Sequence, residues 1–198
     1  MTDVIVDLTI PGWSSARKLE RLGELASQVP QEGTIVEVGS FCGRSAYVLG
    51  HNKHQSVKLM CVDMFPQLWM TSGPVSEYPG GETLHGDTSQ YYAYETFLKN
   101  MGQVTNLDTL CAFMPLPSWV SINLSVDLIF IDSSHDYETV KSELDMWYPL
   151  MKPNATIVVD DYFDLFPGCI SAVDEFVKEH SPSEFEVHEF AAYISFTG

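Results

Sequence analysis

Three aspartates stand where hydrophobic segments end, and their side chains could bind a cation. Asp132 ends the run Val126–Asp132, and Asp160 and Asp161 end the run Ala155–Asp161. If the two runs are neighbouring parallel strands, their carboxyl ends meet at one edge of the sheet. Carboxylates crowded in this way repel one another unless a cation or a proton intervenes. Hard oxygen ligands suit Mg²⁺, Mn²⁺ or Ca²⁺, so we expect a divalent metal there, with Mg²⁺ as the expected ion. The alternative is that Asp160 and Asp161 cap the following loop and stay solvated.

A histidine three residues after Asp132 could accept a proton. Imidazole changes its charge near neutral pH, so His135 could take the proton of a hydroxyl group. The alternative is a histidine that only makes a structural hydrogen bond at the beginning of a helix. His85 is a weaker second candidate, because it lies in an irregular segment.

The segment Glu37–Ser45 reads EVGSFCGRS and predicts a ligand-binding turn between a strand and a helix. Gly39 allows a tight turn, and Gly43 allows a close approach at the beginning of the helix. Free N–H groups at that helix start can hold a carboxylate, such as the methionine end of S-adenosylmethionine (SAM). An NAD-binding loop, G-x-G-x-x-G counted from Gly39, would need glycine at Phe41 and Arg44. The spacing therefore favours SAM over NAD, although a plain strand–helix connection can also carry two glycines.

The next expected strand, Val57–Val62, is followed by a single carboxylate. Asp63 is placed to accept hydrogen bonds from the two hydroxyl groups of a cofactor ribose. Alternatively, it is a turn residue or a helix cap. The stretch Met64–Thr88 then carries prolines, glycines and aromatic residues without periodicity. Irregular loops of this length inside a compact domain are commonly functional, so we expect residues 64–88 to form a lid over the substrate.

The elements that must position these residues alternate between strand and helix. A first helix is capped by Ser14 or Ser15 and ended by Pro30, and Lys152–Asn154 forms a turn. The last two short strands must form an antiparallel hairpin. This order predicts an α/β fold with a Rossmann-like, doubly wound, mostly parallel sheet and a C-terminal antiparallel hairpin, in one domain of residues 1–198. The expected strands are 34–38, 57–62, 104–111, 126–132, 155–161, 185–190 and 191–196, and the later helices lie near 45–50, 89–101, 136–148 and 170–180.

Composition restricts the partners and the location. The 198 residues include 10 Lys and Arg against 27 Asp and Glu, which gives a net charge of −17. Such a charge repels phosphate backbones, and no basic cluster is present, so we expect no nucleic-acid partner. The four cysteines form no CxxC pair, which argues against a zinc or redox site. No segment approaches the ~20 apolar residues of a membrane span, and no secretory signal begins the sequence. We therefore expect a cytoplasmic protein without membrane contact.

Four motifs together resemble the class I SAM-dependent methyltransferases: VEVGSFCGRSA, the strand-end Asp63, DLIFIDSSHDYETVKSELDMWYPLMKP and IVVDDY. More narrowly, they are similar to the macrocin-type O-methyltransferases, which act on macrolide sugars, and to their cephalosporin-hydroxylase-like relatives. The resemblance runs from about Ile35 to Val177. It departs from the family at Asn154-Ala155, which replaces Gly-Gly, and at Cys111–Pro115, which lacks the Asp or Ser that often follows the third strand. Asn tolerates the left-handed conformation, so the turn is expected to survive.

The resemblance also implies residue roles. Asp132, Asp160 and Asp161 correspond to the magnesium ligands of metal-dependent members, and His135 to the general base of some sugar enzymes. Ala112 and Phe113 would line the adenine. The whole implied SAM site consists of Glu37, Gly39, Ser40, Gly43, Ser45, Asp63, Met64, Ala112, Phe113 and Asp132.

Together these observations predict an enzyme that transfers the methyl group of SAM to a hydroxyl group of a small acceptor, sugar-like or catechol-like, with help from a divalent metal. Two alternatives stay open: a protein of the same fold that binds SAM without turnover, and a nicotinamide-dependent oxidoreductase. The acceptor cannot be read, because the segment 64–88 matches no motif. The sequence also leaves open whether the protein forms a homo-oligomer.

Overall fold

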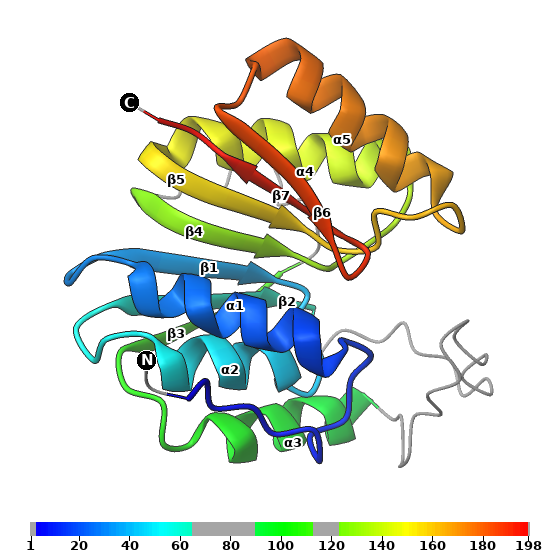
Figure 1. The fold of residues 1–198 in the computed structure, drawn as a ribbon. Coiled ribbons are helices and arrows are strands. Elements are labelled where there is room, and N and C mark those ends of the chain that lie inside the picture. Colours follow the sequence, from blue (N-terminus) through cyan, green and yellow to red (C-terminus); the bar gives the residue numbers. More distant parts are fainter. Residues whose placement is uncertain (1–2, 65–89, 113–122, 198) are drawn as a thin grey trace.

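The computed structural model describes residues 3–64, 90–112 and 123–197, and within them seven strands form one sheet (Figure 1). The strand order is β3-β2-β1-β4-β5-β7-β6. The first five strands of the chain pair in parallel, whereas β7 runs antiparallel to β5 and β6. This arrangement confirms the predicted fold class. The strands are β1 (Thr34–Val38), β2 (Lys58–Asp63), β3 (Leu107–Cys111), β4 (Val126–Ile131), β5 (Met151–Val159), β6 (Glu184–His188) and β7 (Ala191–Ser195).

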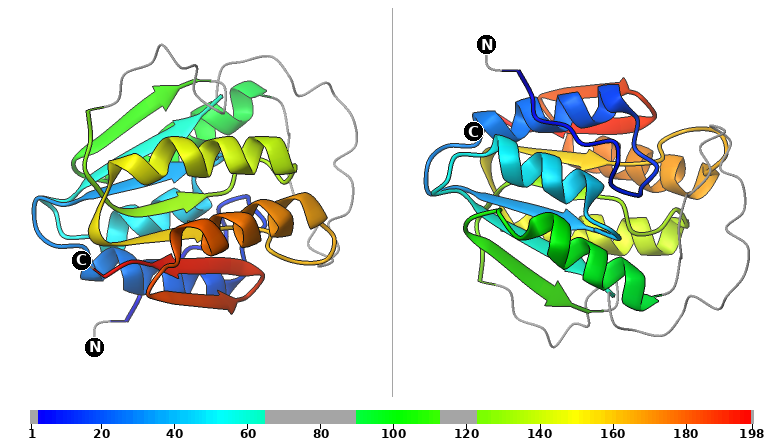
Figure 2. Two further views of the ribbon diagram at one scale, coloured as in Figure 1. Left: turned by 90° about the horizontal axis from the view of Figure 1, so that it is seen from above. Right: turned by 90° about the horizontal axis from the view of Figure 1, so that it is seen from below.

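Helices cover both faces of the sheet (Figure 2). One face carries α1 (Ala16–Gln28), α2 (Arg44–Asn52) and α3 (Gln90–Met101), and the other carries α4 (Tyr137–Trp147) and α5 (Pro167–His180). Buried apolar side chains of the two layers form a separate cluster on each side of the sheet. Among the described helices, none has both the length and the apolar character needed to cross a membrane.

Two helices, α1 and α4, begin at residues whose side chains cap them. The Ser15 side chain accepts a hydrogen bond from the backbone N–H of Lys18 at 3.2 Å, as the predicted N-cap of α1 should. Asp136 caps α4 in the same way, accepting from the backbone N–H of Thr139 at 2.9 Å. Both caps fix the residue at which the helix begins. The cap at Asp136 therefore also fixes the end of the short turn between β4 and α4, which carries His135.

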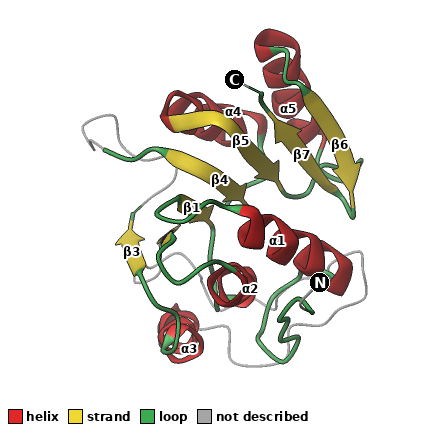
Figure 3. Cartoon of the chain, turned by 60° about the vertical axis from the view of Figure 1, so that its left-hand side comes forward, coloured by secondary structure: helices red, strands yellow, loops and turns green. Residues whose placement is uncertain are grey.

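The predicted turn at Lys152–Asn154 is wrong, because β5 already begins at Met151 and continues through these residues. The pairing of β4 with β5 shifts register between Val126 and Leu128, which accommodates the extra residues of β5 as a bulge. Asn154 does take the expected left-handed conformation, with φ 65°. Figure 3 shows β5 running beside β4 in the same direction, so the two strands end at the same edge of the sheet.

The sheet reverses its winding direction between β1 and β4. The chain moves outward from β1 through β2 to β3, and outward from β4 to β5, so the turns after β1 and β4 diverge. Such a switch point leaves a crevice at the carboxyl ends of the strands. The two turns meet closely at Gly39, where a Cβ atom would lie 2.0 Å from the carbonyl oxygen of Asp132. Only glycine fits there, so the predicted role of Gly39 in a tight turn is confirmed.

Candidate functional site

The turn after β1 is organised by the carboxylate that ends β2. Asp63 Oδ2 accepts hydrogen bonds from the backbone N–H groups of Ser40 at 2.7 Å and Phe41 at 2.8 Å. Gly39 and Gly43 have φ of 90° and 89°, a conformation that favours glycine. Two of the N–H groups of the loop are thus directed to Asp63. A contact between Asp63 and a ribose stays a prediction, but the same side chain clearly holds the loop in shape.

Glu37 lies beneath this loop and is completely buried. The Ser40 hydroxyl donates a hydrogen bond to its carboxylate, while burial raises the pKa of Glu37 to about 7. A carboxyl group without water around it favours its neutral form. Glu37 therefore supports the loop from below, and Ser45, near the start of α2, reaches the cavity above it.

A cavity of about 530 Å³ lies at the carboxyl edge of the sheet. Its wall joins the turn after β1, the end of β2 and the turn after β4, and the segment before α1 closes another side. Of the implied SAM site, it contains Gly39, Ser40, Ser45, Asp63, Met64 and Asp132. Ala112 lies beside this wall, because its backbone N–H donates to the carbonyl of Asp63 at 3.0 Å. Phe113 and the expected lid beyond Met64 lie outside the described residues.

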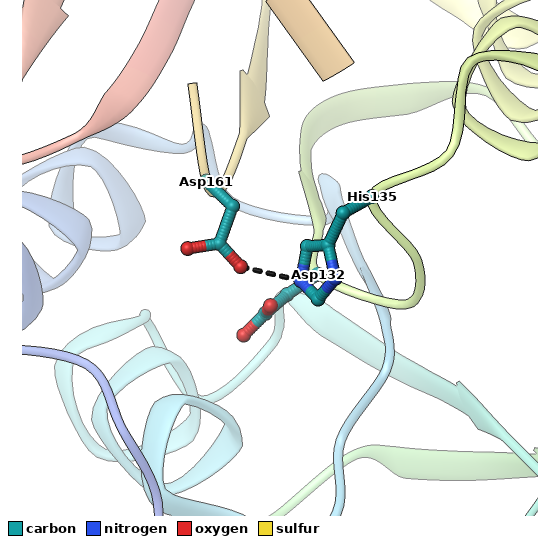
Figure 4. A group of neighbouring side chains, drawn as sticks. All are labelled: Asp132, His135 and Asp161. Atoms are coloured by element: carbon teal, nitrogen blue, oxygen red, sulfur yellow. Dashed lines mark ion pairs between the residues drawn. The ribbon is translucent and has the colours of Figure 1, made fainter. Parts of the chain in front are cut away.

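The turns after β4 and β5 bring two carboxylates and one imidazole together (Figure 4). His135 Nε2 lies 2.5 Å from Asp161 Oδ2, and potential ligand atoms of Asp132, His135 and Asp161 all lie within 4.8 Å of one another. Because β4 and β5 are parallel neighbours, the meeting of Asp132 and Asp161 agrees with the prediction. The sequence predicts His135 as a proton acceptor. It does not predict that His135 lies close enough to Asp132 and Asp161 to be a third metal ligand.

Asp160 differs from its predicted surroundings. Its carboxylate forms a buried ion pair with Lys18 of α1, and its Oδ1 also accepts the backbone N–H of Asp161 at 2.8 Å. The group that could hold a metal in the described part of the chain is therefore Asp132, His135 and Asp161, without Asp160. Sequence reasoning missed Lys18, although a lysine within the apolar stripe of a helix was a visible signal.

Crowding changes the charge behaviour of the cluster as expected for neighbouring carboxylates. Burial, together with the charges of Asp160 and Asp161, raises the pKa of Asp132 well above its ordinary range. Burial also raises the pKa of Asp160, although Lys18 opposes this change. Burial alone would lower the pKa of Lys18, but the facing carboxylates outweigh it and hold the ammonium above its usual value. Lys18 is thus a fixed positive charge inside the cluster.

The imidazole of His135 is also fixed by packing. Its ring stacks on Phe166 with a centroid distance of 4.1 Å and an interplanar angle of 21°. At Gly168, a Cβ atom would come within 3.0 Å of the His135 carbonyl oxygen, so α5 can approach this turn only with glycine there. Phe166 was not predicted as a site residue, because nothing in its sequence position shows which ring it contacts.

This geometry defines a class of protein. A doubly wound sheet with a glycine turn after β1 and a carboxylate after β2 is a Rossmann-like nucleotide-binding domain. Residues 36–162 match a family model described as a methyltransferase domain, and the chain belongs to that family. The match confirms the predicted class, a SAM-dependent methyltransferase.

Solved structures with the same fold include several O-methyltransferases. NovP, an O-methyltransferase, has a TM-score of 0.61 at 18% identity, covering 92% of this chain and 80% of its own. CalS11, a TDP-rhamnose 3′-O-methyltransferase of calicheamicin biosynthesis, has a TM-score of 0.62 at 15% identity, covering 93% and 82%. An O-methyltransferase from Bacillus cereus in complex with SAH has a TM-score of 0.58 at 12% identity, covering 94% and 84%. At these identities the likeness shows the fold.

A curated relative is also similar in sequence. The uncharacterized protein R132 of Acanthamoeba polyphaga mimivirus is 24% identical over 161 residues, which are 78% of this chain. The match spans 66% of that protein, just under two thirds of its length. The relative therefore adds support for a shared domain and carries no information about a substrate.

Proposed function

We propose that the protein transfers the methyl group of SAM to a hydroxyl oxygen of a small acceptor. The observation that carries this proposal is that one cavity is lined both by the glycine loop with Asp63 and by Asp132 and His135. A cofactor held on the loop would thus have its reactive end on the side where a proton acceptor and carboxylates meet. The O-methyltransferases among the fold neighbours support the choice of oxygen as the methyl acceptor.

The chemistry asks little of the protein beyond position and proton removal. The acceptor oxygen forms a bond to the methyl carbon while the carbon–sulfur bond of SAM breaks. The electron pair of the broken bond stays on sulfur. The hydroxyl proton must leave, and His135 is the group that takes it. Asp161, 2.5 Å from Nε2, would orient the imidazole and stabilise its charged form. The products are the methylated acceptor, S-adenosylhomocysteine and the protonated histidine, so atoms and charge balance.

A divalent cation fits the same end of the cavity. Asp132 and Asp161 offer carboxylate oxygens within a few ångströms of each other, and such oxygens suit Mg²⁺ or Mn²⁺. When bound, the cation would lower the pKa of an acceptor hydroxyl and neutralise the carboxylates. We assign His135 the role of proton acceptor and not of metal ligand, because its Nε2 is already paired with Asp161. Its distance also allows it to act as a third ligand, and a histidine variant separates the two roles.

The direct test is turnover of SAM by the purified protein. Mass spectrometry would follow formation of S-adenosylhomocysteine with catechols, vicinal diols and sugars, and with carboxylic acids as a comparison class. Each acceptor would be tested with Mg²⁺, with Mn²⁺ and with excess chelator. We expect turnover with a hydroxylated acceptor and loss of turnover in chelator. SAM that binds but is never consumed would support the alternative of a binding protein, and full activity in chelator would refute metal assistance.

A further inference from the structure

Lys18 occupies an unusual position for a lysine. It lies on the sheet-facing side of α1 among apolar residues, and its side chain is only 7% exposed. Lysine is almost never buried unless it is paired, because removing an ammonium group from water costs several kcal/mol. Here the partner is Asp160, whose Oδ1 receives both the Lys18 ammonium and the backbone N–H of Asp161. Two protein donors therefore share Asp160 Oδ1, and the ion pair with Lys18 neutralises the charge of this carboxylate.

The charges around this pair do not sum to zero. Asp132, Asp160 and Asp161 carry three negative charges when ionised, and Lys18 supplies one positive charge. With all three carboxylates ionised, two negative charges are left over, on Asp132 and Asp161, and His135 lies against the latter. One divalent cation balances them. Without Lys18, the same three carboxylates would face a cation together with a net charge of −3.

We propose that Lys18 is a positioning residue that withholds Asp160 from the cation, so that a divalent ion is held by Asp132 and Asp161 alone and binds weakly. This inference rests on the proposed function, because it concerns the same end of the cavity. The ammonium group of Lys18 competes with the cation for the carboxylate of Asp160 at the end of β5. A weakly held ion keeps more of its positive charge for the acceptor oxygens.

Removing the ammonium should therefore strengthen metal binding. In Lys18→Met the site gains one negative charge, and Asp160 becomes available as a third carboxylate ligand. An electrostatic change of this kind close to a divalent ion is expected to raise its affinity at least about tenfold. Damage to the fold would lower the affinity instead, so a gain distinguishes the proposed role from a merely structural one.

Two matched variants complete the set. Lys18→Arg keeps the charge and should bind the ion like the wild type. The double variant Lys18→Met with Asp160→Asn removes both members of the buried pair, which commonly leaves stability intact. Its net charge equals that of the wild type, and it has no additional carboxylate, so its affinity should stay within about threefold of the wild-type value.

The experiment is a titration of the full chain with Mn²⁺, followed by the electron paramagnetic resonance signal of free Mn²⁺. Unfolding curves and S-adenosylhomocysteine affinity would show that each variant is folded. We expect tighter Mn²⁺ binding in Lys18→Met and near wild-type binding in the other two variants. Unchanged or weaker binding in a folded Lys18→Met protein would overturn the inference, and so would loss of binding in the double variant, because Asp160 would then be a ligand. Binding by Lys18→Met but not by the wild type would overturn the inference as stated, because no ion would then be held by Asp132 and Asp161, and it would also refute metal assistance. Binding by neither would overturn the inference and leave methyl transfer to be judged by SAM turnover.

Discussion

His135 Nε2 lies 2.5 Å from Asp161 Oδ2, which ties the turn after β4 to the end of β5. Asp161 is held in a left-handed conformation, with φ 59°, at the point where the chain leaves the sheet. A strained conformation of a residue without glycine's freedom needs support from its surroundings. The pair has the arrangement that the proposed base and its orienting carboxylate require, and His135 lines the cavity.

Replacing His135 with alanine should lower the rate of methyl transfer. Loss of a general base typically costs about 10²–10⁴-fold in rate. The affinities for S-adenosylhomocysteine and for Mn²⁺ should stay unchanged, because the imidazole is assigned to the proton. Single-turnover kinetics and calorimetry measure the two quantities separately. His135→Gln is the matched control, since it keeps hydrogen-bonding capacity without accepting a proton. Loss of Mn²⁺ affinity in these variants would show that His135 is a metal ligand.

Replacing Asp63 with alanine should weaken cofactor binding. The variant loses the acceptor for the backbone N–H groups of Ser40 and Phe41 and any contact with the ribose. Hydrogen bonds to a charged group contribute roughly 1.5–3 kcal/mol each, so calorimetry with S-adenosylhomocysteine should show a loss of that order. Asp108→Ala is a suitable control, because its carboxylate is exposed on β3 and pairs with Lys58 instead. An unchanged affinity in Asp63→Ala would contradict the assigned role.

The buried carboxyl group of Glu143 on α4 should make stability depend on pH. It is 0% exposed, accepts from the Ser133 hydroxyl, and has its second oxygen without a hydrogen-bond partner in the described part of the chain. Burial raises the pKa of Glu143 from 4.5 to about 7. The folded protein thus keeps a proton that the unfolded chain releases between these pH values. The free energy of unfolding should therefore fall as the pH rises from about 4.5 to about 7.

Glu143→Gln removes this ionisation and keeps the side-chain shape. Above neutral pH the variant should be more stable than the wild type by up to about 3 kcal/mol, since each pKa unit corresponds to about 1.4 kcal/mol. Near pH 4.5 the two should be alike, and part of the slope should persist because the pKa of Glu37 is also raised. Denaturant unfolding across this pH range measures the effect. Glu138→Gln, exposed on the same helix, is the control, and an identical slope in wild type and Glu143→Gln would refute the prediction.

The strands and helices could be predicted because their signals are local. The strand Thr34–Val38 and the cap at Ser15 depend on β-branched residues and a hydroxyl group, which the sequence shows directly. Partners across the fold are different. Helical periodicity places Lys18 on the buried side of a helix but does not show that this helix crosses the end of β5, where Asp160 lies.

The same limit applies to other contacts of the site. Asp63 could be recognised as a strand-end carboxylate, yet its hydrogen bonds to the loop depend on how closely β1 and β2 turn together. The bulge near Asn154 has the sequence of a turn, because a residue in the left-handed conformation is common to both. The function of residues 64–88 as a lid stays a prediction, and a deletion at its centre should abolish turnover while S-adenosylhomocysteine still binds.

The most direct measurement traces the methyl group itself. The wild-type protein would be incubated with SAM carrying a ¹³C-labelled methyl group and an acceptor that supports turnover, and the product would be examined by NMR and mass spectrometry. Methyl transfer at this site predicts one labelled methyl group bonded to oxygen, formed in equal amount with S-adenosylhomocysteine and strongly reduced in His135→Ala. Label on nitrogen or carbon, or product formation that does not respond to His135, would contradict it.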